Sequence, residues 1–291
     1  MPLNTIFRLP PAHACASLWV RKAIHALGVA AIALMTPVGA TAANADDTIE
    51  RRALTIEAAL TGFPQRSAAE LVQLIRDIDV GSPGDKRLVY GLFGQARVLS
   101  GDPKAAALLA DQLEMEATSK SDLPGRATAL LIRSAIESSA GDTSKAASLA
   151  RQARDLVRDS DDEFIRHWAA LALGTSTRTL GQAEEALASL QQALSSAERA
   201  RNPYRRSNAY YQLSVLQRSL KNGTDALAAS VAAFKYAEAA NSAFAMASAK
   251  MAESAVMELL VRPVREMSAI EQALAIARDA SSQTAESRVL V

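Results

Sequence analysis

The chain has 291 residues, in which 32 Lys and Arg nearly balance 31 Asp and Glu. This balance argues against a nucleic-acid partner, because domains that bind nucleic acid usually have a pI above about 9. Apolar residues make up 49% of the chain and aromatic residues only 4%. A core with this composition is built mainly from Ala, Leu, Val and Ile, which favours close-packed helices over sheets.

The first segment has the three parts of a secretory signal peptide. Arg21 and Lys22 form a basic flank, residues 23–35 are apolar, and small residues follow over 38–43. We therefore expect a signal peptide over residues 1–42 and a mature chain in the periplasm.

Cleavage is expected after Ala42, with Ala45 as the alternative. An uncleaved signal would anchor the chain in the membrane, but the apolar run is shorter than the roughly 20 residues that a spanning helix needs. Cys15 is the only cysteine and lies in the segment to be removed. A mature chain without cysteine suits an oxidising compartment and has no disulfide or thiolate chemistry.

Beyond residue 43 the sequence repeats itself with a period of about 40 residues, as an array of structural units does. Four sets of small or apolar residues keep this spacing. They are Ala106, Ala146, Ala186 and Ala226; Leu113, Ala153, Ala193, Ala233 and Ala273; Gly94, Ser134, Gly174, Ser214 and Ser254; and Gly101, Gly141 and Gly181. The third set contains only Gly and Ser, which suits close helix contacts, and the fourth set marks the turn between two helices.

Each unit is predicted to hold two amphipathic helices, because apolar residues recur three and four positions apart. We expect first helices at 47–60, 85–99, 125–139, 162–179, 204–220 and 242–258, and second helices at 67–78, 103–118, 143–158, 183–199, 224–240 and 264–280. Residues 284–291 would begin a seventh pair that remains incomplete.

Two helix starts have recognisable capping residues. Asp102 is expected to cap the N-terminus of a second helix, with Pro103 at its first position. Ser67 and Glu70 have the spacing of a capping box, which predicts that a second helix opens at residue 67.

One unit resembles the tetratricopeptide signature. The residues that carry the resemblance are Leu173-Gly174, Gly181, Ala186, Leu190 and Ala193-Leu194. This resemblance implies an all-α, right-handed α-solenoid of antiparallel helix pairs over residues 43–291. The period of about 40 residues is longer than the roughly 34 residues of that family, and Arg133 and Glu253 occupy positions that are normally apolar. Either those units are shifted by one residue or their helices are longer.

No set of catalytic residues stands out, and we expect neither an enzyme nor a cofactor or metal. The sequence lacks the H-E-x-x-H, G-x-S-x-G and phosphate-loop motifs, and His167 is the only histidine of the mature chain. The acidic residues Asp159, Asp161, Asp162 and Glu163 could hold a hard cation. A solvated loop that caps the next helix is the favoured interpretation, because the spacing is not that of an EF-hand.

The family resemblance implies that the first helices line a concave ligand groove. It selects Gln95, Leu131, Trp168, Leu171, Thr175, Arg178, Asn208, Tyr211, Gln212, Val215, Arg218 and Met251. Arg178 and Arg218 are one repeat period apart, so they should stack on neighbouring units and could hold a carboxylate or phosphate. Two ordinary exposed arginines are the alternative. Core packing is an equal alternative for Trp168 and Tyr211.

The segments Ala273-Leu274-Ala275-Ile276-Ala277-Arg278-Asp279-Ala280 and Ala285-Glu286-Ser287, with the signal peptide and repeats, resemble the periplasmic sensor region of bacterial GGDEF-type diguanylate cyclases. The catalytic G-G-D-E-F motif is absent from the sequence. The resemblance implies a protein- or peptide-binding scaffold with a sensory role in signalling. An adaptor for envelope assembly or maintenance is the alternative.

The C-terminal end is expected to expose an apolar edge. A repeat array needs a terminal helix with a polar outer side, whereas this sequence finishes on Val289-Leu290-Val291. Such an edge predicts self-association through the last repeat.

Overall fold

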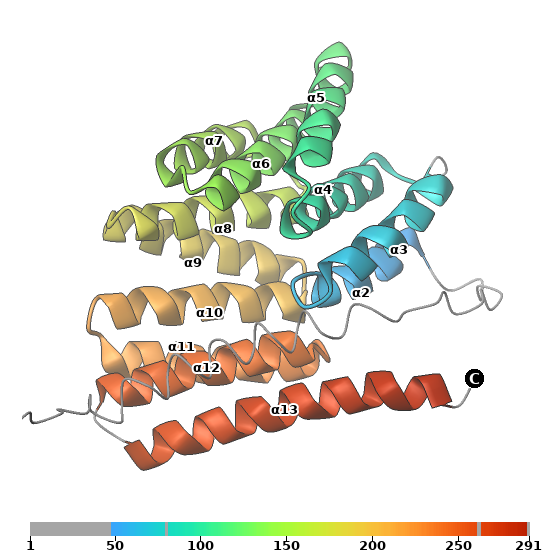
Figure 1. Ribbon diagram of the computed structural model, residues 1–291. Coiled ribbons are helices and arrows are strands. Elements are labelled where there is room, and N and C mark those ends of the chain that lie inside the picture. Colours follow the sequence, from blue (N-terminus) through green and yellow to red (C-terminus); the bar gives the residue numbers. More distant parts are fainter. Residues whose placement is uncertain (1–47, 79–80, 261–262, 290–291) are drawn as a thin grey trace, which may run out of the picture. The chain divides into compact units, whose positions relative to one another are not determined.

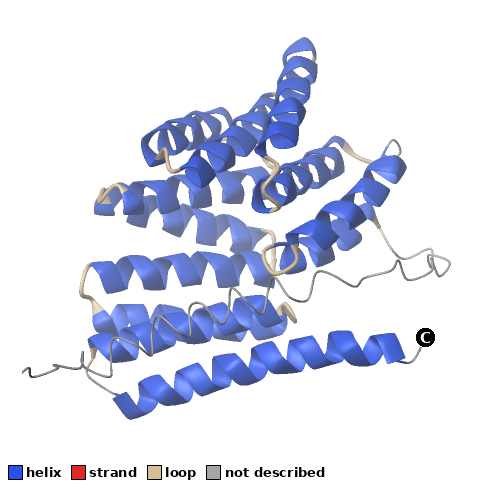
Figure 2. Cartoon of the chain, viewed as in Figure 1, coloured by secondary structure: helices blue, strands red, loops and turns tan. Residues whose placement is uncertain are grey.

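The computed structural model describes residues 48–78, 81–260 and 263–289 (Figure 1). The expected signal peptide, its cleavage site and Cys15 lie outside this range. The described residues form twelve helices and no strand (Figure 2). The first helices are α2 (Ile49–Leu60), α4 (Pro83–Leu99), α6 (Leu123–Ala140), α8 (Glu163–Thr179), α10 (Pro203–Ser219) and α12 (Ala243–Leu259). The second helices are α3 (Pro64–Asp77), α5 (Pro103–Ser119), α7 (Thr143–Leu156), α9 (Ala183–Arg199), α11 (Gly223–Ala239) and α13 (Pro263–Val289).

Consecutive helices pack as pairs, and each second helix also packs against the first helix of the next pair. The first helices of successive pairs contact one another along the array (Figure 1). This arrangement confirms the predicted α-solenoid of helix pairs and places the first helices in one layer. The layer is where the predicted groove residues lie.

Glycine makes the turn inside three of the pairs, as predicted. Gly101, Gly141 and Gly181 have φ angles of +79°, +89° and +76°. Glycine adopts this left-handed conformation without steric cost, which explains its recurrence at these three turns. At the equivalent turn between α10 and α11, Lys221 has a φ of +63°.

The caps confirm one prediction and correct another. The Asp102 carboxylate accepts a hydrogen bond from the Ala105 amide at 3.1 Å, and Pro103 begins α5. Ser67 does not open a helix, because α3 already begins at Pro64, whose fixed φ suits a first helical position. Ser67 is instead buried within the helix, and Glu70 forms an ion pair with Arg66.

The Gly and Ser set lies at close helix contacts. A Cβ atom on Gly174 would lie 2.7 Å from the Leu190 side chain and 3.2 Å from its backbone nitrogen. Where serine replaces glycine, its hydroxyl donates across the pair, from Ser134 to the Ala146 carbonyl at 2.9 Å and from Ser214 to the Ala226 carbonyl at 2.8 Å. Small side chains therefore set the approach of the two helices of a pair.

Replacing Gly174 with Leu should lower the free energy of unfolding by about 1 to 3 kcal/mol, because the added side chain overpacks the contact with α9. Urea unfolding followed by circular dichroism measures the change. Gly84→Leu is the control, because the nearest atom to a Cβ there is the Ser82 hydroxyl at 3.6 Å. An unfolding midpoint unchanged by Gly174→Leu would contradict the close contact.

The C-terminal helix differs from the prediction of an unfinished seventh pair. Helix α13 runs without a break to Val289, because no Gly or Pro follows Pro263 to end it. Ala269 and Ala273 are buried, whereas Glu271 and Arg278 are exposed. The outer side of α13 is therefore largely polar as far as residue 280. The expected self-association through Val289-Leu290-Val291 concerns side chains outside the described ones.

None of the described helices combines the length and hydrophobicity that a membrane-spanning helix requires.

Candidate ligand-binding face

The predicted groove residues all lie on first helices, but the structure divides them into two groups. The first group lies near the N-terminal halves of α8 and α10 and also includes residues of α4 and α6. The second group lies on the C-terminal halves of α8 and α10. Met251 lies apart from both, half-buried on α12.

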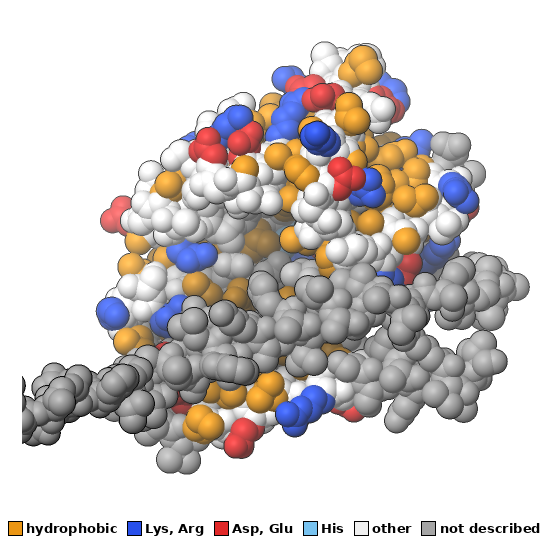
Figure 3. All heavy atoms as spheres, viewed as in Figure 1, with side chains coloured by type: hydrophobic (Ala, Val, Ile, Leu, Met, Phe, Trp, Pro, Cys, Tyr) orange, Lys and Arg blue, Asp and Glu red, His pale blue; other side chains and the backbone are white. Residues whose placement is uncertain are grey.

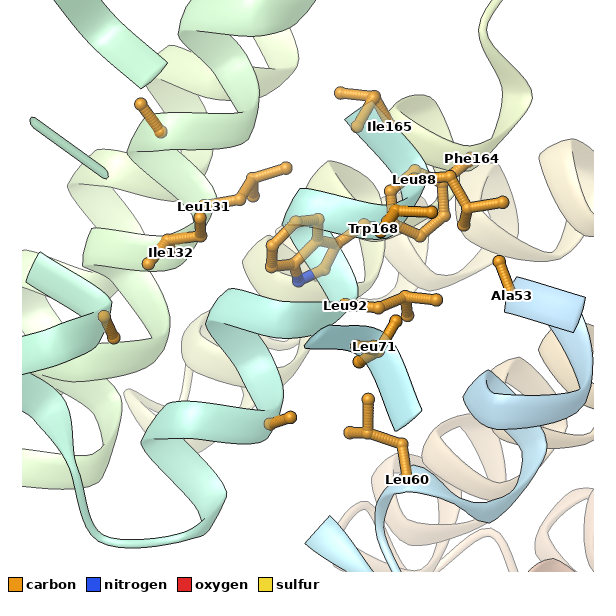
Figure 4. Close-up of a cluster of buried hydrophobic side chains, with 14 of the residues drawn as sticks. Ala53, Leu60, Leu71, Leu88, Leu92, Leu131, Ile132, Phe164, Ile165 and Trp168 are labelled. Carbon is orange, nitrogen blue, oxygen red and sulfur yellow. The ribbon is translucent and has the colours of Figure 1, made fainter. Parts of the chain in front are cut away.

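Trp168 is part of the core. Of the two interpretations given for it, groove residue or core residue, the structure supports the second. Its side chain is 7% exposed, and its ring lies 5.7 Å from that of Phe164. Figure 4 shows Trp168 close to Leu88, Leu92 and Phe164. A Cβ atom on Gly91 would lie 2.9 Å from the Trp168 ring, so α4 approaches α8 closely here. Leu131 of α6 is likewise fully buried.

Helix α2 is joined to this part of the face by a buried ion pair. The Arg205 guanidinium of α10 donates to both carboxylate oxygens of Glu57 of α2, at 2.8 and 3.0 Å. Only 5% and 10% of the two side chains are exposed. The guanidinium also lies 4.8 Å from the centre of the Phe164 ring. The two residues are 148 positions apart in the sequence, and nothing in the repeat pattern indicates their contact.

Two further contacts hold the end of α2 against later pairs. The Thr61 and Tyr204 hydroxyls lie 3.4 Å apart, and the Ser242 hydroxyl donates to the Ala58 carbonyl at 2.7 Å. Burial raises the pKa of Tyr204 to about 12, so this phenol stays protonated at neutral pH. The first pair is therefore tied to the starts of both α10 and α12.

What remains between α2, α4, α8 and α10 is a pocket of about 60 Å³. Its walls include Gln95, Trp168, Leu171 and Asn208 from the predicted set, together with Glu57 and Arg205. This volume holds a few water molecules but no peptide. The structure thus brings these four predicted residues together around a space too small for a peptide.

His167 is buried in the same region. Its Nδ1 atom lies 2.9 Å from the Ala193 carbonyl, and 4% of the residue is exposed. Burial, and secondarily the charge of Arg205, lowers its pKa to about 3. The imidazole is therefore neutral at physiological pH. Ser207, one repeat later, makes the equivalent bond to the Ala233 carbonyl at 2.9 Å, so this position serves helix pairing.

The second group forms what we call the α8–α10 strip. It consists of Thr175, Arg178, Tyr211, Gln212, Val215 and Arg218, all half-buried. The Thr175 hydroxyl donates to carbonyls of its own helix, the nearer being Leu171 at 2.9 Å. The remaining polar side chains of the strip form no hydrogen bond with another described residue. The strip therefore presents unused donors and acceptors beside apolar surface.

Arg178 and Arg218 lie near enough within this strip for the charge of one to affect the other. Each lies in the last turn of its helix. The pKa of Arg178 is lowered from its usual value, first by burial and also by the nearby charge of Arg218. The Nε atom of Arg178 is buried and has no hydrogen-bond partner in the described part of the chain.

Two of the four acidic residues around the start of α8, Asp162 and Glu163, have structural partners. The Asp162 carboxylate accepts the Ile165 amide at 3.2 Å, which is the predicted cap, and also pairs with Arg87 at 2.8 Å. Glu163 pairs with Arg199 at 2.6 Å. This favours the capping interpretation of the cluster over a cation site.

A second pocket, of about 600 Å³, lies between α2 and two turns that precede first helices, and no sequence pattern indicated it. Leu54 and Phe63 line it from the first pair, and Arg201, Tyr204 and Phe244 line it from the turns before α10 and α12. Its walls come from segments about 150 and 190 residues apart, which local sequence patterns do not relate.

No protein-family model matches the chain, and no curated protein is significantly similar to it. Solved structures do match.

The chain is similar to BtubC from P. vanneervenii with 18% identity and a TM-score of 0.58, over 81% of this chain and 93% of that one. It is also similar to aspartyl phosphate phosphatase F from Bacillus subtilis, with 13% identity and a TM-score of 0.56, over 84% and 78% of the two chains. A Rap protein in complex with competence and sporulation factor gives 13% identity and a TM-score of 0.55, over 80% and 67%. These structural neighbours are tetratricopeptide-like helical repeat proteins, and this chain shares their fold.

Proposed function

We propose that this protein is a non-catalytic scaffold that binds a protein or peptide segment along the α8–α10 strip. The observation that carries the proposal is the composition of the strip. It combines Tyr211, Gln212 and two arginines in half-buried positions, and Val215 supplies an apolar contact. Aromatic and arginine side chains are the residues that contribute most to protein–protein binding.

The shape of the strip favours a peptide over a small molecule. Its residues spread over two neighbouring helices, whose axes in packed helices lie about 8 to 10 Å apart. A small ligand is normally enclosed by a pocket of about 300 to 1,000 Å³, and these residues line neither of the two pockets described above. The Rap protein, a structural neighbour, was solved in complex with competence and sporulation factor, which supports a partner-binding role for this kind of array.

The position of His167 supports a non-catalytic role. It is the only histidine after residue 42, and a general acid or base must be within reach of its substrate with a pKa near the working pH. His167 is buried and has a pKa of about 3, so it meets neither condition.

We place this scaffold in the periplasm as the sensory part of a signalling system of the diguanylate cyclase type. The support is the N-terminal sequence, with its basic flank and short apolar run, and the resemblance of the C-terminal segments. An envelope assembly adaptor is the second candidate, because the same strip would serve a permanent partner. Exchange of the bound partner with conditions would favour the sensor, and constitutive binding would favour the adaptor.

Selection of phage-displayed random peptides on the purified protein tests the scaffold function. Selected peptides should bind Tyr211→Ala and Gln212→Ala variants at least about tenfold more weakly, because interface residues of this kind contribute about 1 to 2 kcal/mol each. Val231→Ala is the matched control, since this side chain is 52% exposed on α11, outside the strip. Failure to select any peptide, or selected peptides that bind all three variants equally, would refute the proposal.

A further inference from the structure

We propose that Arg178 and Arg218 form a subsite of the α8–α10 strip that binds a carboxylate group of the peptide ligand. The inference rests on the proposed function and adds the chemistry of the ligand. Arg178 and Arg218 lie in the last turns of α8 and α10. Figure 3 shows basic side chains at several places on one face of the molecule, its left side included.

The two arginines differ from most others at the same position in a helix; among the described residues Arg76, in the last turn of α3, hydrogen-bonds only to the Gln73 side chain. An arginine in the last turn is ordinarily explained by the negative partial charge of the helix C-terminus. Arg97 and Arg199 also lie in last turns, but each has a carboxylate partner, Asp102 and Glu163 respectively. Arg178 has no carboxylate or backbone partner among the described residues. A role at the helix end alone does not require two such cations side by side.

Arg178 is also unusual among the arginines whose Nε atoms are buried without a partner. The others in the described chain are Arg97, Arg126, Arg166 and Arg206. Three of these bind carboxylates, and Arg206 donates to the Glu198 carbonyl at 3.0 Å. Arg178 alone in this set uses none of its nitrogens for such a bond. Its guanidinium is therefore available to a ligand.

The described residues supply no anion that pairs with either arginine. Glu184 and Asp225 lie in the first turns of the helices that follow, and Glu258 lies one repeat period after Arg218. All three are exposed, and none forms an ion pair with either arginine in the described structure. Two partly buried like charges repel, and the charge of Arg218 adds to the effect of burial, the larger cause, in lowering the pKa of Arg178. Locally unfavourable arrangements of this kind are characteristic of functional sites.

A carboxylate suits this position better than a phosphate. Guanidinium groups bind carboxylates through two parallel hydrogen bonds, and a pair of them can hold both oxygens. The site lies at two helix C-termini, whose carbonyl ends carry negative partial charge. That charge opposes a doubly charged phosphate more than a singly charged carboxylate. Phosphate sites, in contrast, commonly use helix N-termini.

Fluorescence anisotropy with a labelled hexaglutamate peptide, blocked at both ends, tests the subsite. Hexaglutamine is the control peptide, and inorganic phosphate is the competing anion. We expect hexaglutamate to bind and hexaglutamine to bind at least tenfold more weakly. Arg178→Gln and Arg218→Gln should each weaken hexaglutamate binding about tenfold or more, since a charge-assisted hydrogen bond contributes about 1.5 to 3 kcal/mol.

The matched control is Arg201→Gln. Arg201 is exposed in the turn before α10, at the opposite end of that helix from Arg218, and its side chain has no partner in the described chain. Its replacement should leave the affinity unchanged, so that a nonspecific loss of positive charge is excluded. Arg178→Lys keeps the charge but loses the planar fork, and it should bind less tightly than the wild type if the fork matters.

Three results would overturn the subsite. They are no binding of hexaglutamate to the wild type, equal loss of affinity in Arg201→Gln, and tighter binding of inorganic phosphate than of the peptide. Each leaves the scaffold function standing if phage-selected peptides still depend on Tyr211 and Gln212. Thermal melting followed by circular dichroism shows whether each variant is folded. If Arg178→Gln is not folded, Arg178→Lys takes its place in the test.

Discussion

Replacing Glu57 with Ala should lower the free energy of unfolding by about 3 to 5 kcal/mol, because it breaks a buried ion pair. The substitution would leave the Arg205 guanidinium buried, with 5% of its side chain exposed and no carboxylate to neutralise it. The contact of Arg205 with the Phe164 ring offsets only part of this loss, because a cation–π contact contributes about 0.5 to 2 kcal/mol.

Urea unfolding of four proteins separates the pair from its surroundings. They are the wild type, Glu57→Ala, Arg205→Met and the double variant, and the double variant should be more stable than either single one. Glu70→Ala is the control, since Glu70 forms an exposed pair with Arg66 that should contribute at most about 0.5 kcal/mol. Additive losses in the double variant would show that the two side chains do not act as a pair.

Acidification should destabilise the protein through His167. The pKa of His167 is about 3 in the folded chain against an ordinary value of 6.5. Below pH 6.5 the unfolded chain therefore takes up a proton that the folded chain does not. Stability should fall by about 1.4 kcal/mol per pH unit as the pH decreases from about 6.5 towards 3, and this contribution is fully present only above pH 6.5.

The comparison of the wild type with His167→Asn isolates this effect. Asparagine retains a donor for the Ala193 carbonyl but does not titrate in this range. The pKa of Glu163 is also lowered, by the hydrogen bond and charge of Arg199 against the opposing effect of burial, so carboxylates add their own loss in both proteins. The wild type should show the steeper slope between pH 6.5 and 4.5. Parallel slopes would mean that His167 is protonated in the folded state.

Much of the fold could be predicted because its signals are local. Gly101 predicts the turn, because glycine favours the left-handed conformation found there. Asp102 and Pro103 predict the start of the helix that follows. The start of α3 could not be placed, because Ser67 and Glu70 match a capping box equally well in a helix interior. The predicted range of α13 ends at residue 280, before the observed end at Val289. The repeat period predicts where a repeat ends, but it does not predict where a helix ends.

The candidate site was only half predictable. The repeat spacing places Arg178 and Arg218 at equivalent positions, in the last turns of α8 and α10. The same spacing does not predict which part of the layer of first helices is covered by α2. Glu57 and Arg205 belong to the first and fifth pairs, and a repeat pattern relates only a unit and its neighbours. Gln95 and Asn208 line a small pocket because the ion pair between Glu57 and Arg205 holds α2 against α10.

The contacts of α2 with α10 and α12 also bear on how the array unfolds. In a linear repeat protein each unit touches only its neighbours, so unfolding begins at an end and proceeds unit by unit. Here the first pair forms hydrogen bonds with Arg205 and Ser242 of later pairs. Unfolding of the first pair therefore requires that these distant contacts break together. Such contacts raise the mean sequence separation of touching residues and slow folding. The described pairs should consequently melt in one cooperative transition, in place of the gradual fraying of an open array.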